Sequence, residues 1–214
     1  MPPPPTTTAQ STWPALRRFL RPRPTVERCE LCSEPLATAH AHLVEPTTRR
    51  ILCACDACAV LFDNETRTRY RRVPRDARSV PGFSLSDVQW TALGIPIGLA
   101  FFFHSTPAER VVAIYPSPAG PTETLLERDA WHTLARNHPT LNALRPDVEA
   151  LLVNRVSRTH RYHVAPIDKC YELVGLIRTH WRGLSGGDEL WQHVERFFTD
   201  LDQRARPARE PSHA

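Results

Sequence analysis

The sequence has little lysine, little glycine and no long apolar run. Only Lys169 among its 27 basic residues is a lysine, and eight glycines stand against 21 prolines. The longest apolar stretch, ALGIPIGLAFFF at 92–103, is too short to cross a bilayer and contains a proline. No apolar segment follows the basic N-terminus, as it would in a secretory signal. We therefore expect a cytoplasmic protein with no membrane span, in which extended segments dilute the globular part.

The net charge of +4 is unevenly distributed along the chain. Residues 1–28 carry +4 and residues 66–78 carry +5, whereas residues 29–65 carry −4 and residues 79–214 carry −1. The basic charge therefore belongs to an N-terminal arm and to one internal segment. This pattern allows binding to an acidic protein surface or to nucleic acid, and it does not choose between them.

Composition divides the chain into five parts. The sequence predicts an α+β protein in which a small N-terminal module with a treble-clef-like zinc site precedes a larger α+β domain that ends in a two-helix hairpin. The predicted parts are a disordered basic arm (1–27), a zinc-binding module (28–65), an arginine-rich linker (66–80), the α+β domain (81–206) and a disordered tail (207–214).

Hydrophobic periodicity predicts the elements of the larger domain. Strands are expected at 90–103, 110–115, 150–156 and 161–167, a loop at 116–121, and helices at 125–137, from about 168 to 181, and from 188 onward. Asp168 is expected to cap the first of the last two helices. The turn RGLSGG at 182–187 separates that pair.

Five of the six cysteines lie within 30 residues, and four of them form two CxxC pairs. Cys29, Cys32, Cys55 and Cys58 have the spacing C-x2-C-x22-C-x2-C. Two such pairs are typical of a four-thiolate zinc site, because each CxxC turn brings two sulfurs to one ion. The segments HAHLV (40–44) and RRILC (49–53) predict a hairpin, and DACAVLF (56–62) predicts a helix. This order of knuckle, hairpin and helix resembles a treble-clef zinc finger.

The identity of the ion and of the third ligand is left open by the spacing alone. Cys53 could replace Cys55 as a ligand, or it could be a small apolar residue of the strand. An iron site of the rubredoxin type also uses two CxxC pairs, although Ser33 and Ala59 stand where its knuckles usually carry glycine. An iron–sulfur cluster on Cys53, Cys55 and Cys58 would have unusual spacing. Zinc is therefore the predicted cofactor, with iron as the alternative.

Two histidines lie between the CxxC pairs and allow another interpretation of residues 29–58, which we call the cysteine window. His40 and His42 are alternative metal ligands, and the layout is similar to that of HNH endonucleases, in which a histidine of the first hairpin strand activates water. However, Ala41 precedes His42 where that family has Asp or His, and the helix after Cys58 has no histidine to hold a catalytic metal. We therefore predict no catalytic residue and expect a structural role for both histidines.

The arginine run at 66–78 is the candidate partner-binding segment. It comprises Arg67, Arg69, Arg71, Arg72, Arg75 and Arg78, which surround one aromatic residue, Tyr70. A basic stretch beside a zinc module is a fair nucleic-acid footprint. A solvated linker that balances the acidic module explains the same residues. No P-loop, GxGxxG or GxSxG motif accompanies the run.

Three stretches together resemble a known family. They are VAIYPSPAGPTETLL (112–126), APIDKCYELVGLIRTHWRGLSGGDELW (165–191) and the cysteine window itself. The chain resembles an uncharacterised actinobacterial protein family encoded beside nickel–iron (NiFe) hydrogenase genes, over most of residues 27–202. No catalytic residues carry over from that family.

The resemblance implies a context rather than a chemistry. It suggests an accessory or scaffold protein for NiFe-hydrogenase assembly or operation, with a hydrogenase subunit as partner. The alternatives are a nucleic-acid-binding zinc protein that uses the arginine run, and a rubredoxin-like iron electron carrier.

Overall fold

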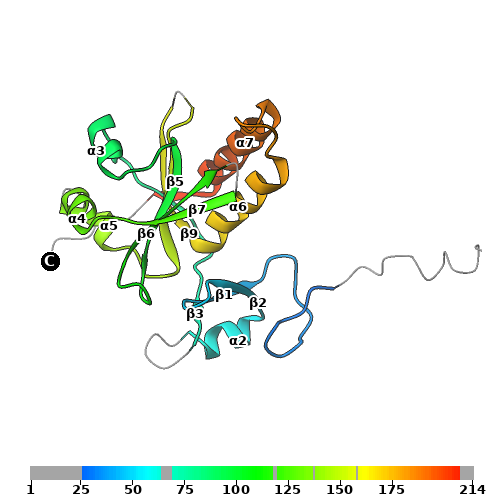
Figure 1. The fold of residues 1–214 in the computed structure, drawn as a ribbon. Helices are drawn as coiled ribbons and strands as arrows, with labels where there is room; N and C mark the ends of the chain where they lie inside the picture. The colour runs from blue at the N-terminus through cyan, green and yellow to red at the C-terminus, as the bar shows by residue number, and fades with distance from the viewer. Residues whose placement is uncertain (1–25, 64–68, 118–119, 137, 158, 208–214) are drawn as a thin grey trace, which may run out of the picture.

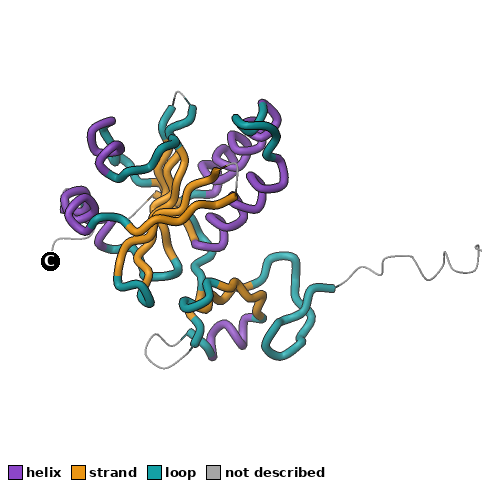
Figure 2. Tube along the Cα trace, viewed as in Figure 1, coloured by secondary structure: helices purple, strands orange, loops and turns teal. Residues whose placement is uncertain are grey.

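The computed structural model describes residues 26–63, 69–117, 120–136, 138–157 and 159–207. Most of the predicted arm, most of the predicted tail and Arg67 therefore lie outside the described residues. The fold is α+β, as expected. A small N-terminal sheet with one helix lies against a larger sheet that carries helices on both faces (Figure 1, Figure 2).

The N-terminal module follows the predicted order of knuckle, hairpin and helix. Strand β1 (Ala41–Glu45) pairs antiparallel with β2 (Arg50–Ala54), and helix α2 (Asp56–Leu61) follows directly. Strand β3 (Arg71–Arg72) adds to the other edge of β1, so the sheet order is β2-β1-β3. The hairpin register places Ala41 opposite Ala54 and His42 opposite Cys53.

The larger sheet has seven strands in the order β10-β4-β9-β8-β5-β6-β7. Their bounds are β4 (Arg78–Ser79), β5 (Leu99–Ser105), β6 (Arg110–Ser117), β7 (Gly120–Leu125), β8 (Glu149–Asn154), β9 (Arg161–Pro166) and β10 (Arg206–Pro207). All neighbours pair antiparallel except β10 and β4, which are parallel.

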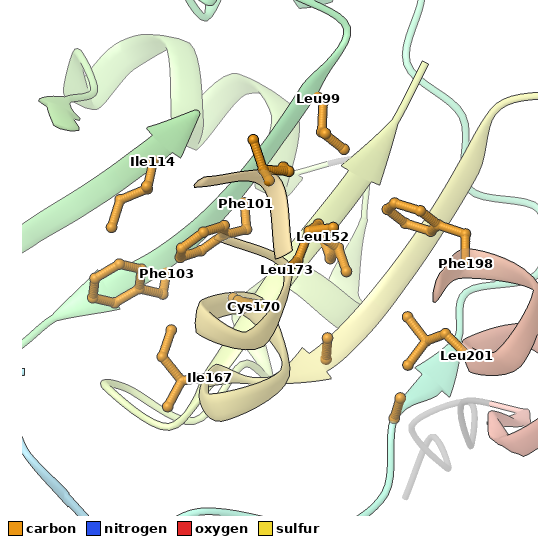
Figure 3. Packing of buried hydrophobic residues seen from close by; sticks show 14 of the residues in the cluster. Leu99, Phe101, Phe103, Ile114, Leu152, Ile167, Cys170, Leu173, Phe198 and Leu201 are labelled. Carbon is orange, nitrogen blue, oxygen red and sulfur yellow. The ribbon is translucent and has the colours of Figure 1, made fainter. Parts of the chain in front are cut away.

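Helices cover both faces of this sheet, which explains why its central strands are apolar at consecutive positions. Helices α3 (Asp87–Ala92), α4 (Arg128–Arg136) and α5 (Pro139–Asn142) contribute to the core on one face, and α6 (Ile167–His180) and α7 (Asp188–Arg204) to the core on the other. Phe102 and Leu151 belong to the first core. Phe101 and Leu152 belong to the second, where they pack with Leu173 of α6 and Phe198 of α7 (Figure 3).

Three predicted elements of the larger domain differ from the structure; the smallest difference is that the helix expected at 125–137 begins only at Arg128. The strand expected at 90–103 begins only at Leu99, and its first residues belong to α3. Ser86 starts that helix through a capping box with Gln89, a local signal that the apolar run obscured. The loop expected at 116–121 is instead the end of a β6–β7 hairpin, with Pro116 opposite Pro121. Pro121 is tolerated because β7 is an edge strand. Pro116 is tolerated because β6 no longer pairs with β5 at this position; that pairing ends at Ile114.

The segment predicted as a linker is built into both sheets. Its described part supplies β3 to the module and β4 to the larger domain, and Val73 and Ala77 are buried in the core under α6 and α7. Val44 of the module belongs to the same core, and Ile51 packs against it. The module and the larger domain are therefore joined by a shared apolar interface rather than by a free tether.

The RGLSGG turn connects α6 and α7 as expected and is held by two indole groups. Trp181 Nε1 donates to the Gly183 carbonyl at 2.8 Å, and Trp191 Nε1 donates to the Ser185 carbonyl at 3.0 Å. Gly186 and Gly187 have φ values of 87° and 80°, a region that favours glycine. The turn is thus a fixed structure that leaves Leu184 91% exposed at its tip.

Candidate metal centre

The four cysteines of the two CxxC pairs converge. The sulfurs of Cys29, Cys32, Cys55 and Cys58 all lie within 4.8 Å of one another. The Cys32 and Cys55 sulfurs, from different pairs, are 3.7 Å apart. A tetrahedral ion with zinc–sulfur bonds of about 2.3 Å separates its ligand sulfurs by about 3.8 Å. The donor set and its spacing therefore fit a four-coordinate thiophilic ion.

Local backbone geometry builds each pair of ligands. In the first knuckle the Ser33 N–H donates to the Cys29 carbonyl at 2.8 Å, and Ser33 adopts a left-handed φ of 64°. Ser33 thus takes the backbone conformation that glycine most readily adopts, so the lack of glycine does not prevent the turn. In the second knuckle Cys55 is the N-cap of α2, and its sulfur accepts from the Cys58 N–H at 3.4 Å.

The protonation of the cluster shows what an ion would contribute. Burial acts to raise the pKa of Cys29, but backbone hydrogen bonds from Cys55, Leu31 and Cys32 outweigh it and hold that pKa at about 6. Burial and the neighbouring thiols raise the pKa of Cys58 well above its usual range. Without a cation the cluster therefore favours a thiolate at Cys29 and resists one at Cys58. A divalent ion would supply the charge that four thiolates require.

The module has only a small apolar core of its own. Its buried members are Ala41, Leu43, Ala54 and Ala59 together with two of the cysteines, and a few partly buried side chains, Leu31, Leu36, Phe62 and Tyr70, pack against them. A cluster this small, in which three of the buried side chains are alanines, buries too little surface to fold some 35 residues alone. Metal binding can supply the missing folding free energy, as it does in small metallo-domains.

The hairpin that carries the cysteines has two different faces. Successive strand residues point to opposite sides of a sheet. Ala41 and Leu43 pack with Cys58 and Ala59 of α2, on the side of the four cysteines. Val44 and Ile51 pack against the larger domain. In Figure 1 the hairpin accordingly lies between α2 and that domain.

Cys53 and the two histidines belong to the second face. One ligand atom each of His40, His42 and Cys53 lie within 4.8 Å of one another, in a group separate from the four-sulfur cluster. The geometry thus gathers Cys55, and not Cys53, with the other CxxC cysteines. His42 Nδ1 is 2.6 Å from Asp168 Oδ2 at the start of α6.

Asp168 has a different place from the one the sequence predicted. Pro166 is the N-cap of α6 and Asp168 lies inside the first turn, where its Oδ1 accepts from the Lys169 N–H at 2.8 Å. Its other oxygen is directed to His42, 126 residues away. No spacing rule could have revealed this partner, because the contact depends on how the module sits on the larger domain.

The predicted partner-binding arginines are mostly paired within the chain. Arg71 Nε lies 3.3 Å from Asp147 Oδ2, and Arg78 Nη2 lies 3.1 Å from both oxygens of Glu149; both carboxylates are buried. Arg69 pairs with Glu45, and Arg75 with Asp56. Arg72, half-buried on β3, forms no ion pair with a described residue. Much of the charge in this run thus serves the fold.

The fold and the sulfur cluster define an α+β protein with a candidate four-cysteine metal centre in its N-terminal module. The chain belongs to a family of unknown function, DUF5947, whose profile matches residues 28–205. A search of curated proteins and a search of solved structures each found no match. Among the described residues, no helix is both long and apolar enough to cross a membrane.

Proposed function

We propose that this protein is a non-catalytic, zinc-binding accessory or scaffold protein. The observation that carries the proposal is the four-sulfur cluster. Four protein thiolates complete a tetrahedral shell and leave no position for a substrate or a reactive water, whereas catalytic zinc sites keep one position open. The ion of this centre would hold the module in shape and would take no part in a reaction.

The ion would support the rest of the fold as well as the module. The hairpin that follows the first knuckle places Val44 and Ile51 on the core under α6 and α7. Arg49, at the end of the hairpin turn, pairs with Glu123 of β7, with Nη2 2.8 Å from Oε1, and its guanidinium lies 5.4 Å from the centre of the Phe103 ring. Folding of the module is thereby coupled to the larger domain.

The larger domain would supply a docking surface for a protein partner. Leu184 is 91% exposed on a turn that two indole groups hold in place. An apolar side chain on a pre-organised turn loses little conformational freedom when a partner covers it. We assign docking to this turn in preference to the arginine run, because four of those arginines already have carboxylate partners.

The partner we propose is a subunit of a NiFe-hydrogenase, in its assembly or operation. The support for this step is the sequence resemblance alone, through the run from 165 to 191 and the cysteine window. Zinc as the resident ion is likewise part of the proposal, supported by the four-thiolate donor set.

Metal content tests the first part. We would purify the full chain without tags or added metal and measure its elements by mass spectrometry. We expect zinc in the native chain, and we expect the Cys32→Ser variant to contain one zinc ion per chain fewer. Iron in place of zinc would instead favour an electron carrier, and a chain without metal would remove the centre altogether.

Co-purification tests the second part. The full chain would be expressed in an organism that encodes it and captured under reducing conditions, and bound proteins would be identified by mass spectrometry. Hydrogenase subunits should be recovered with the native chain, at least fivefold less with Leu184→Ser, and equally with Val88→Ser, whose side chain is 80% exposed on α3. Recovery that does not depend on Leu184 would contradict the assignment of the docking turn.

A further inference from the structure

A second set of ligand-type side chains lies on the hairpin face that is turned toward the larger domain. His42 and Cys53 are directly opposite each other in the β1–β2 register. The rings of His40 and His42 pack edge to face with their centroids 4.9 Å apart. One ring nitrogen of each histidine and the Cys53 sulfur lie within 4.8 Å of one another.

Hydrogen bonds assign the free nitrogen of each ring. His40 Nδ1 lies 2.9 Å from the Ala37 carbonyl oxygen, and His42 Nδ1 lies 2.6 Å from Asp168 Oδ2. A carbonyl and an ionised carboxylate can only accept, so Nδ1 carries the proton in both rings. In the neutral imidazole, Nε2 then keeps its lone pair. Histidines that bind metals are typically held in this way, with the second nitrogen donating to a carboxylate or a backbone carbonyl.

The free nitrogen of His40 is buried without a partner. The His40 side chain is only 8% exposed, and its Nε2 has no hydrogen-bond partner among the described residues. Buried polar atoms in folded proteins are nearly always satisfied, so an exception needs an explanation. A metal ion at this nitrogen would satisfy it.

We propose that His40, His42 and Cys53 form a second metal site, for Zn²⁺ or another divalent ion of similar softness, with a fourth position for water. Two imidazoles and one thiolate suit such an ion, and three protein ligands leave one position open. Binding releases one proton, from the Cys53 sulfur. The carboxylate of Glu30, which accepts from the Cys53 N–H at 2.7 Å, adds negative charge beside the site.

Occupancy would require only a small contraction of the three side chains. Zinc bonds of about 2.0–2.3 Å place ligand atoms about 3.3–3.8 Å apart, and one ring nitrogen of each histidine already lies with the Cys53 sulfur within 4.8 Å. The His42 ring is 30% exposed and Cys53 is half-buried, so both have room to adjust. This site is separate from the four-cysteine centre and does not depend on the function proposed above.

The site would also connect the module to the larger domain. Asp168 is anchored in the first turn of α6 by the Lys169 N–H and orients His42 through its other oxygen. It acts as a positioning residue and not as a ligand. Replacement of Asp168 should therefore lower the affinity of the site for the ion without changing the number of ligands.

Metal counting in the full chain tests the site. Protein from zinc-supplemented cultures would be dialysed against metal-free buffer and analysed by elemental mass spectrometry. We expect two zinc ions in the native chain and one in both Cys53→Ser and His40→Gln. His104→Gln, which changes an exposed histidine of β5, should keep two. Circular dichroism and thermal unfolding followed by tryptophan fluorescence would establish that the variants fold.

Each other count has a definite meaning. One zinc in the native chain, unchanged in Cys53→Ser, would overturn the second site and leave the four-cysteine centre standing. No zinc in the native chain would overturn both. Loss of all zinc in a folded His40→Gln variant would also overturn the proposal, because the two sites would then not be separate.

Affinity separates the positioning role from a structural one. Competition with a zinc indicator should show second-site binding weakened about 10–100-fold in Asp168→Asn, with the first site unchanged and the melting curve within a few degrees of the native one. Unchanged second-site affinity would overturn the role of Asp168.

Discussion

His42 and Asp168 lie 126 residues apart in the sequence, and His42 Nδ1 is 2.6 Å from Asp168 Oδ2. The contact joins the first strand of the cysteine module to the first turn of α6. It lies on the same hairpin face as Val44 and Ile51, which pack into the core under α6 and α7. The cysteine module is therefore a structural part of the larger domain, and changes in one should be felt in the other.

Removal of one cysteine ligand should destabilise the larger domain as well as the module. Cys58→Ser should cost one metal ion and speed proteolysis within residues 28–63, since the module depends on its ion. Because Val44 and Ile51 would lose their packing, the larger domain should lose about 1–3 kcal/mol and its melting midpoint should fall by roughly 3–10 °C. Tryptophan fluorescence measures this, since the described tryptophans all lie in the larger domain.

Cys32→Ser should give the same result, because it removes a ligand from the other pair. A tryptophan melting curve that stays unchanged while the module is digested would show that the two parts fold independently.

Arg78 should contribute to stability rather than to partner binding. Glu149 is buried and accepts from Arg78 Nη2 at 3.1 Å through both oxygens. Arg78→Ala would leave a buried carboxylate without its main partner, with Arg145 as its remaining partner among the described residues, so we expect a loss of about 3 kcal/mol in urea unfolding.

The control for Arg78 is Arg75→Ala. Arg75 pairs with Asp56, and both side chains are exposed, so this change should cost less than 1 kcal/mol. If the two variants were equally stable and both lost binding to nucleic acid, the arginine run at 66–78 would instead be a nucleic-acid-binding segment.

His163 should make the protein less stable as the pH falls through the range below 6.5. Burial lowers the pKa of His163 below its usual value, although Asp202, whose Oδ1 lies 2.8 Å from Nε2, acts in the opposite direction. The unfolded chain binds a proton at a pKa of about 6.5 and the folded chain only at lower pH. The contribution of His163 is therefore complete above about pH 6.5 and is lost as the pH falls toward the folded pKa.

An NMR titration of the imidazole measures this directly. The His163 pKa should lie below 6.5, and Asp202→Asn should lower it further. His138, whose pKa is also lowered by burial, should titrate in the same sense. A His163 pKa above 6.5 would show that Asp202 outweighs burial.

Two glycines near the C-terminus should respond in opposite directions to alanine. Gly175 lies inside α6, and a Cβ built there meets nothing within 4 Å, so Gly175→Ala should stabilise the protein by about 0.5–1 kcal/mol. A Cβ at Gly186 would come within 2.6 Å of Leu190 Cδ2, and its φ is 87°. Gly186→Ala should cost about 1–3 kcal/mol. Chemical unfolding of the two variants side by side measures both; equal effects would contradict the structure of the turn.

The sequence alone determined the local parts of this protein. The CxxC spacing predicted a four-cysteine cluster, with the choice between Cys53 and Cys55 left open, and the apolar pattern located the β1–β2 hairpin, α2, α6 and α7. These features depend on residues close together in the chain, where spacing and periodicity act directly. The start of β5 was predicted too early because an apolar run obscured the capping box of α3. The β6–β7 hairpin was missed because two prolines obscured its edge strand.

Only the tertiary structure decided the remainder. Cys53 joins the two histidines because the hairpin register places it opposite His42. Asp168 reaches His42, and Arg71 reaches the buried Asp147, because the module packs on the domain through Val44 and Ile51. Arg78 reaches the buried Glu149 because β4 joins the larger sheet. Such contacts depend on which faces of distant elements come together, and one sequence carries no local signal for that choice.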